Sequence, residues 1–134
     1  MGRTPAVQPA PGVWRISTAP ADLVNSFAFV NDDGQVTLVD AGLKLHTPGH
    51  TPGHVALLHE PSAVLITGDS IWNMRRRMTW PFKALCTDSA MTELTASVLG
   101  EVDYDVVAFT HGPEIRDGAR EAVRGFLRDK AAAS

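Results

Sequence analysis

The sequence has little of what would assign it to a specialised class of protein. Its 134 residues include one cysteine, Cys86, so no disulfide can form within the chain, and a reducing, cytoplasmic setting is expected. No apolar run approaches the roughly 20 residues that a membrane-spanning helix needs, and the N-terminal residues lack the apolar region of a secretory signal. A formal net charge of −3 gives no general attraction to nucleic acid or to anionic membranes. The expected partner is therefore a small-molecule substrate.

What is present fits one globular domain. Hydrophobic residues make up 44% of the chain and charged residues 20%, which are ordinary values. Residues 1–12 are rich in proline and alanine, and we expect a flexible arm there, followed by a single domain over residues 13–130. Strands are predicted for the β-rich runs VWRIS (13–17), SFAFV (26–30), QVTLVD (35–40), HVALLHE (54–60) and AVLIT (63–67).

The spacing of the other segments completes the expected order of elements. NDDG at 31–34 and Pro61–Ser62 are turn signals for two hairpins, whereas residues 70–87 show no clean period and are predicted to be a long loop. Apolar residues then recur at helical spacing, which predicts helices at about 88–99 and 117–129. Strands followed by alternating strands and helices favour an α/β (α+β layered) fold with the sheet inside and helices outside.

Polar side chains follow three of the predicted strands at their carboxyl ends. VTLVDAG ends in Asp40, AVLITGD in Asp69, and DVVAFTHG in His111. Ligands gather at the carboxyl ends of strands in α/β sheets, so these groups are candidates for a common site. The stretch LHTPGHTPGHVALL (45–58) adds three histidines around two prolines and two glycines, and it is either a polar turn or a loop built to hold an ion.

Four blocks together resemble the metallo-β-lactamase fold superfamily, and most of all its glyoxalase II-type hydrolases. They are LVDAG (38–42), TPGHTPGHVAL (47–57), LITGDSIW (65–72) and AFTHGP (108–113), in that order. The resemblance implies an αβ/βα sandwich with one or two metal ions at one edge, most simply zinc, and a metal-dependent hydrolase activity on a thioester, ester or phosphodiester.

The resemblance also implies roles for individual residues. His50, Asp69 and His111 would be metal ligands, with Asp69 bridging two metals and acting in catalysis. Asp40 would be a further catalytic carboxylate that accepts a hydrogen bond from a ligating imidazole, and His54 would be an orienting residue. Neutral imidazoles and carboxylates are ligand types that suit zinc and other divalent metals.

One part of the family's signature is absent from this sequence. Its members carry His-x-His-x-Asp-His between the VDAG and TPGH blocks, whereas here only Leu43, Lys44 and Leu45 separate Gly42 from His46. The three remaining ligands would give at most one shared site, to which His46 could add a fourth. We therefore expect impaired hydrolysis or none.

Loss of a strand-and-helix section has a structural consequence as well. The remaining strands would expose apolar faces or edges, and such surfaces favour pairing with another chain. A homodimer is therefore expected, and the alternative function is a non-catalytic, dimeric metal-binding or structural remnant of the fold.

The block ITGDSIW is also compatible with a second enzyme class. It resembles the Gly-Asp-Ser block of serine esterases, with Ser70 as the nucleophile. That family places an Asp three residues before its catalytic His, whereas residue 108, three before His111, is alanine. The TPGHTPGH block would also go unexplained, so the metallo-hydrolase hypothesis is preferred.

Overall fold

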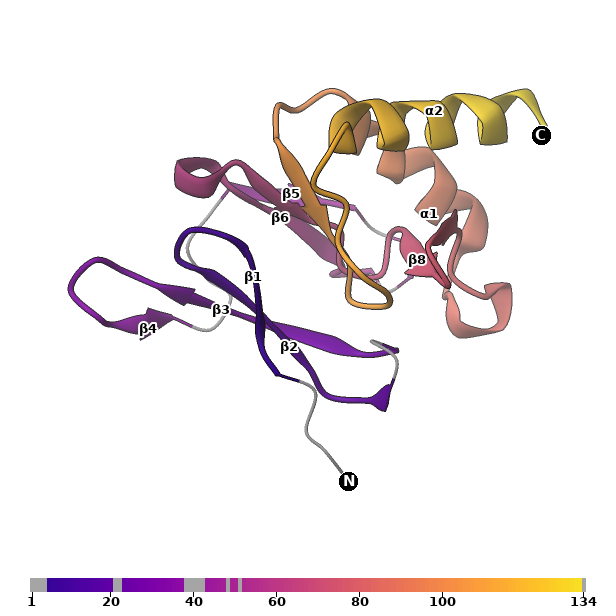
Figure 1. The fold of residues 1–134 in the computed structure, drawn as a ribbon. Helices are drawn as coiled ribbons and strands as arrows, with labels where there is room; N and C mark the ends of the chain where they lie inside the picture. Colours follow the sequence, from indigo (N-terminus) through magenta and orange to yellow (C-terminus); the bar gives the residue numbers. More distant parts are fainter. Residues whose placement is uncertain (1–4, 21–22, 38–42, 48, 51, 134) are drawn as a thin grey trace.

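In the computed structural model the chain forms three layers, two β-sheets and a layer of helices (Figure 1). The structure describes residues 5–20, 23–37, 43–47, 49–50 and 52–133, and of residues 37 and 43–46 only the backbone. Helices α1 (Ser89–Thr95) and α2 (Ala119–Ala132) lie on the face of the second sheet that points away from the first sheet. The predicted layered α/β class is confirmed. Within the described residues, it takes the form of two packed sheets with helices on the outer face of the second sheet.

The first sheet is an antiparallel meander in the order β1-β2-β3-β4. Its hairpin β3–β4 turns at residues 31–35, where Asn31 accepts a hydrogen bond from the backbone of Gly34 and Gly34 has a φ of 81°. The hairpin predicted from NDDG is thereby confirmed. The strands are β1 (Val7–Ala10), β2 (Val13–Ser17), β3 (Asn25–Val30) and β4 (Val36–Thr37).

The second sheet has the order β10-β7-β6-β5. β5 and β6 form a hairpin, β6 pairs antiparallel with β7 through the predicted turn at Pro61 and Ser62, and β7 pairs parallel with β10. The strands are β5 (Leu43–His46), β6 (Val55–His59), β7 (Val64–Ile66) and β10 (Val106–Ala108).

Alternation along the second sheet divides its apolar side chains between two cores. In β7, Leu65 packs towards the helices, whereas Val64 and Ile66 pack towards the first sheet. β10 repeats the pattern, with Val107 on the helix side. Successive strand residues point to opposite faces, so a strand buried on both sides reads as one continuous apolar run.

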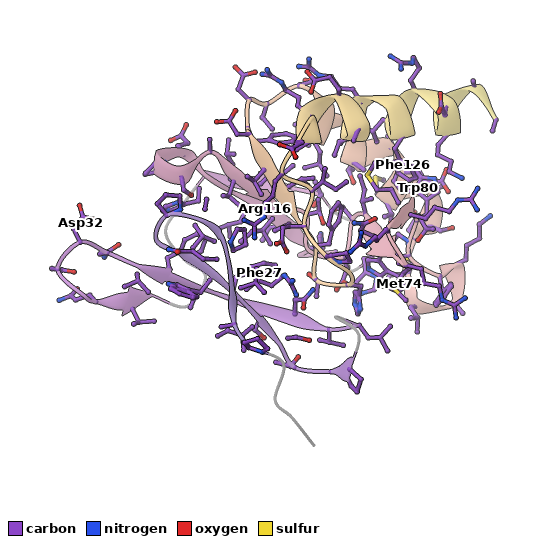
Figure 2. The ribbon with its side chains drawn as sticks, in the orientation of Figure 1. Phe27, Asp32, Met74, Trp80, Arg116 and Phe126 are labelled. Carbon is purple, nitrogen blue, oxygen red and sulfur yellow. The ribbon has the colours of Figure 1, made fainter. Side chains whose placement is uncertain are left out.

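The helices complete the larger core. Asp88 caps α1 by accepting a hydrogen bond from the backbone of Met91 at 2.9 Å, as its position before the periodic segment predicts. A 3₁₀ turn (Ala96–Gly100) follows. Helix α2 buries Val123 and Phe126, and the Phe126 ring lies 4.8 Å from that of Trp80, which Figure 2 shows beneath the helix.

The predicted flexible arm over residues 1–12 is wrong for its second half. Val7–Ala10 form β1, which pairs with β2 through a tight turn at Pro11 and Gly12. Gly12 has a φ of 75°, and a Cβ on it would stand 2.9 Å from the carbonyl oxygen of Val30. Proline followed by a left-handed glycine is a turn signal, which the proline-rich composition obscured.

The predicted long loop over residues 70–87 also contains structure. β8 (Trp72–Met74) and β9 (Arg77–Thr79) form a short hairpin, followed by a 3₁₀ turn at Lys83–Leu85. Its turn residues Arg75 and Arg76 have φ values of 53° and 62°. Bulky residues seldom occupy this region, so two arginines do not signal a turn.

A buried ion pair ties the two sheets together. The Arg15 guanidinium on β2 donates to Glu114 at 2.6 Å, and the two side chains are only 5% and 6% exposed. Burial by itself would raise the pKa of Glu114, but hydrogen bonds from Arg116 and Arg15 offset it and leave the pKa lowered. The charged form is therefore favoured more in the folded protein than in the unfolded one.

We expect Glu114→Gln to lower the free energy of unfolding at pH 7 by about 3 kcal/mol, since it removes the carboxylate charge from a buried ion pair with Arg15. A carboxyl with a lowered folded pKa stabilises above its unfolded pKa, so wild-type stability should fall as the pH drops below about 4.5. The variant should lose less over that range. Urea denaturation from pH 7 to pH 3 measures both effects, with the exposed Glu101→Gln as control. Parallel pH profiles for wild type and Glu114→Gln would contradict the prediction.

Candidate metal centre

The parallel register of β7 and β10 brings Asp69 and His111 together. Ile66 pairs with Ala108, and the two functional residues each lie three positions further along their strands. The imidazole Nε2 of His111 stands 3.1 Å from Oδ1 of Asp69. The structure thus brings two of the three expected strand-end side chains side by side.

His50 approaches the same carboxylate from the loop between β5 and β6. Its Nε2 lies 3.4 Å from Oδ2 of Asp69. The loop is held against the start of α1, because the backbone of Asp88 donates to Gly49 and that of Thr87 donates to His50. Gly49 has a φ of 138°, and a Cβ there would come within 2.2 Å of the backbone of Thr92, so only glycine fits.

The other ring nitrogen of His111 fixes its tautomer. Nδ1 contacts the carbonyl oxygen of Leu23, which can only accept, so Nδ1 carries the hydrogen. A neutral His111 then aims the lone pair of Nε2 at the Asp69 oxygen. Two acceptors at 3.1 Å repel unless a proton or a metal cation lies between them. Metal-ligating histidines commonly donate their second N–H to a backbone carbonyl in this way.

His54 contacts the backbone of Asp69 instead of its carboxylate. The Asp69 amide donates to Nε2 of His54 at 2.7 Å, and Nδ1 of His54 lies 2.9 Å from the Thr47 hydroxyl and 3.2 Å from its carbonyl. Burial lowers the pKa of His54 most, although the nearby Asp69 charge partly offsets this, so the neutral ring is favoured. Both nitrogens are engaged, which suits the orienting role that the family resemblance implies.

Trp72 is a further member of the site. Its indole Nε1 donates to Oδ1 of Asp69 at 3.1 Å, and its ring lies 4.4 Å from the His111 ring. The hydrogen bond fixes the carboxylate, and the ring covers one side of the imidazole. The sequence signal for this contact is the spacing, because Trp72 follows Asp69 by three residues and a single turn of the chain places the two side chains together.

Cys86 is a second neighbour that the sequence did not predict. Its Sγ lies 3.7 Å from Nδ1 of His50, on the opposite side of that ring from Asp69. No sequence motif places this histidine beside the cysteine, because 36 residues separate the two along the chain. The contact arises only from the packing of the β5–β6 loop on the segment before α1.

Comparisons with known proteins agree on one fold. The probable metallo-hydrolase YflN of Bacillus subtilis is 36% identical over 50 residues, which are 37% of this chain and 19% of that protein. The probable metallo-hydrolase YybB of Bacillus subtilis is 30% identical over 80 residues, 59% of this chain and 36% of that protein. No protein-family model matches the chain.

A solved structure supports the same conclusion at the level of the fold. An archaeal metallo-β-lactamase superfamily protein from Sulfolobus tokodaii superposes with a TM-score of 0.51 and 19% identity, over 69% of this chain and 38% of that one. The chain therefore has a metallo-β-lactamase type of fold, and its sequence is similar to probable metallo-hydrolases over part of its length. It spans about a third or less of the length of the curated relatives that it matches.

Within this metallo-β-lactamase fold, the described donors suit a divalent metal in kind and spacing but not in number. Tetrahedral zinc with nitrogen and oxygen ligands places neighbouring donors about 3.3 Å apart, close to the two imidazole–carboxylate distances of 3.1 and 3.4 Å. However, the imidazoles meet different oxygens of Asp69, so each metal position has two donors. Among the described residues no group of three His, Cys, Asp or Glu is arranged to hold an ion.

The remaining predicted site residues can be placed only in part. Asp40 lies outside the described residues, and for His46 only the backbone, at the end of β5, is described. Ser70, the nucleophile of the serine-esterase hypothesis, is fully buried and donates to the Thr47 hydroxyl at 3.1 Å. A buried hydroxyl cannot meet a substrate, which removes that alternative. No helix within the described part of the chain is long and apolar enough to cross a membrane.

We expect Gly68→Ala to disturb the site through His54. Gly68 has a φ of 58°, and a Cβ there would stand 2.6 Å from Nε2 of His54. Gly118→Ala is the matched control, since Gly118 has a φ of 65° and nothing within 4 Å of its Cβ position. Left-handed strain should cost each variant about 1–2 kcal/mol, and the clash should cost Gly68→Ala about 1–3 kcal/mol more. Equal losses of unfolding free energy would show that the His54 contact does not constrain Gly68.

Proposed function

We propose that this chain is a metal-dependent hydrolase-like protein whose metal site, with His50, Asp69 and His111 as its ligands, is incomplete. The observation that carries the proposal is the approach of two imidazole nitrogens, His111 Nε2 and His50 Nε2, to the two carboxylate oxygens of Asp69 at 3.1 and 3.4 Å. A cation at either position would use an imidazole and the carboxylate as ligands. The likeness of the chain to metallo-hydrolases supports the same chemistry.

Hydrolysis should be weak or absent, because each side of Asp69 offers one imidazole. A bound zinc ion would supply a Lewis acid and lower the pKa of its water to about 7. The protein's own contribution is positional. His54 fixes the backbone of Asp69, Trp72 fixes its carboxylate, and the Leu23 carbonyl fixes the ring of His111.

We expect the protein purified without added metal to bind zinc, and His111→Ala to weaken that binding at least tenfold. Titration calorimetry with zinc chloride measures it directly, without reference to activity. His59→Ala is the control. His59 ends β6 at the β6–β7 turn, where its ring contacts Ser62 and Phe29 and none of the candidate ligands. Equal zinc affinity in wild type and His111→Ala would overturn the assignment of the ligand.

A hydrolysis panel then separates a weak enzyme from an inactive one. Thioester, ester and phosphodiester substrates are incubated with the zinc-loaded protein and with Asp69→Asn. Turnover that disappears in Asp69→Asn supports a hydrolase. Zinc binding without turnover on any substrate favours the alternative, a non-catalytic metal-binding remnant.

The second candidate, a dimeric binding or structural protein, is favoured by large apolar side chains at the surface. Phe82, Leu85 and Leu94 are 63%, 58% and 68% exposed. Burial of such residues stabilises association. We expect a homodimer by light scattering at micromolar concentration, and dissociation to monomer in Leu94→Lys. A wild-type monomer under those conditions would contradict this candidate.

A further inference from the structure

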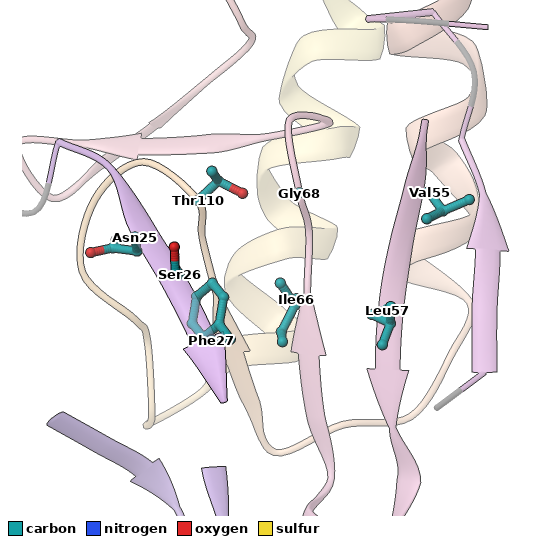
Figure 3. Close-up of a pocket in the computed structure, with 8 residues that line it drawn as sticks. All are labelled: Asn25, Ser26, Phe27, Val55, Leu57, Ile66, Gly68 and Thr110. Carbon is teal, nitrogen blue, oxygen red and sulfur yellow. The ribbon is translucent and has the colours of Figure 1, made fainter. Parts of the chain in front are cut away.

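A cavity of about 410 Å³ lies between the two sheets at the end that carries Asp69 and His111 (Figure 3). Its walls are the apolar side chains of Phe27 on β3 and of Leu57 and Ile66 on β6 and β7. This volume falls within the usual range of small-molecule sites. The cavity is open to solvent, so a ligand could enter without unfolding of either sheet.

Two residues that line the cavity are neighbours in sequence of the candidate metal ligands. Gly68 and Thr110, which line it, directly precede Asp69 and His111. Gly68 presents no side chain there, and it is required as glycine by the approach of His54. Gly68 therefore leaves room for the ring that holds the Asp69 amide and adds no side chain to the cavity wall.

Polar side chains around the cavity are few, and the largest of them is committed elsewhere. The Asn25 amide donates to the carbonyls of Phe109 and Gly112, and its oxygen accepts from Arg15. Its polar atoms therefore hold the loop that carries His111. Ser26 and Thr110 remain as the polar lining, beside apolar walls that suit a hydrocarbon group.

Side chains supply the walls of this cavity. Phe27, Leu57 and Ile66 belong to β3, β6 and β7, and each of these strands lies between two neighbours in the order of its sheet. An occupant of the described part of the cavity therefore contacts these apolar side chains, and a small hydrocarbon group suits them.

We propose that the inter-sheet cavity binds the hydrocarbon part of an acyl substrate, whose carbonyl lies at the end next to Asp69 and His111. The substrate class named here rests on the proposed function, whereas binding of the hydrocarbon requires neither metal nor turnover. The cavity thereby favours acyl esters or thioesters over a phosphodiester as substrates. It also predicts an affinity that depends on chain length.

The test uses methyl ketones from 2-butanone to 2-octanone, which carry an uncharged carbonyl and cannot be hydrolysed. Dissociation constants are measured by NMR titration of the metal-free protein. Burial of one methylene contributes about 0.8 kcal/mol, so each added methylene should tighten binding about fourfold until the cavity is filled. Shifted resonances should map to the walls of the cavity, including Leu57 and Ile66.

A matched pair of variants ties the binding to this cavity. Val55→Phe adds a ring at a half-buried position of the lining, and should weaken 2-octanone binding at least tenfold. Val36→Phe makes the same change on exposed β4, outside the lining, and should leave binding unchanged. Thermal melts establish that both variants are folded. If Val55→Phe is unfolded, Ser26→Phe, at an exposed position of the same lining, replaces it.

The outcomes separate this proposal from the proposed function. Affinity independent of chain length, or equal in the two valine variants, would overturn the cavity proposal even if the protein hydrolyses esters. Affinity that falls as protein concentration rises would also overturn it, because a second copy would then occupy the cavity. Chain-length-dependent binding without any turnover or zinc binding would leave the cavity proposal standing and refute the hydrolase.

Discussion

The parallel pairing of β7 with β10 is the constraint on which the site depends. Ile66 lies opposite Ala108, so the two strands reach the edge of the sheet in step, and Asp69 and His111 leave it at equivalent positions. A slip of one residue would turn every side chain of one strand to the other face and move the apolar set of β7 out of its two cores. The energy that holds the register is therefore hydrophobic burial, and the polar site takes its geometry from it.

Around that register, contacts to the backbone keep the carboxylate in place. His54 accepts from the amide of Asp69, and Trp72 donates to its side chain, so the main chain and the carboxylate are fixed separately. The imidazoles of His50 and His111 then face different oxygens. This division suits a carboxylate that bridges two positions, and it also explains why neither position reaches three donors among the described residues.

Much of this arrangement could be predicted from local sequence. Asp69 and His111 follow apolar runs, and strand ends in α/β sheets converge, which sufficed to group them. The hairpin at NDDG was predictable because Gly34 supplies the left-handed turn residue. The turn at Arg75 and Arg76 was not, since it lacks such a residue. The contact between Cys86 and His50 was beyond sequence reasoning, because it depends on how two distant segments pack.

Among the described residues, the shortage of metal donors and the open cavity share an origin in the short connection between the sheets. Only five residues separate β4 of the first sheet from β5 of the second, too few for a further strand and helix. The first sheet packs through Phe27 and Phe29 on one face of the second, and the end nearest Asp69 is left open. A longer connection could supply both ligands and cover. In this chain the same space is accessible to a ligand, and its apolar walls determine which ligand fits.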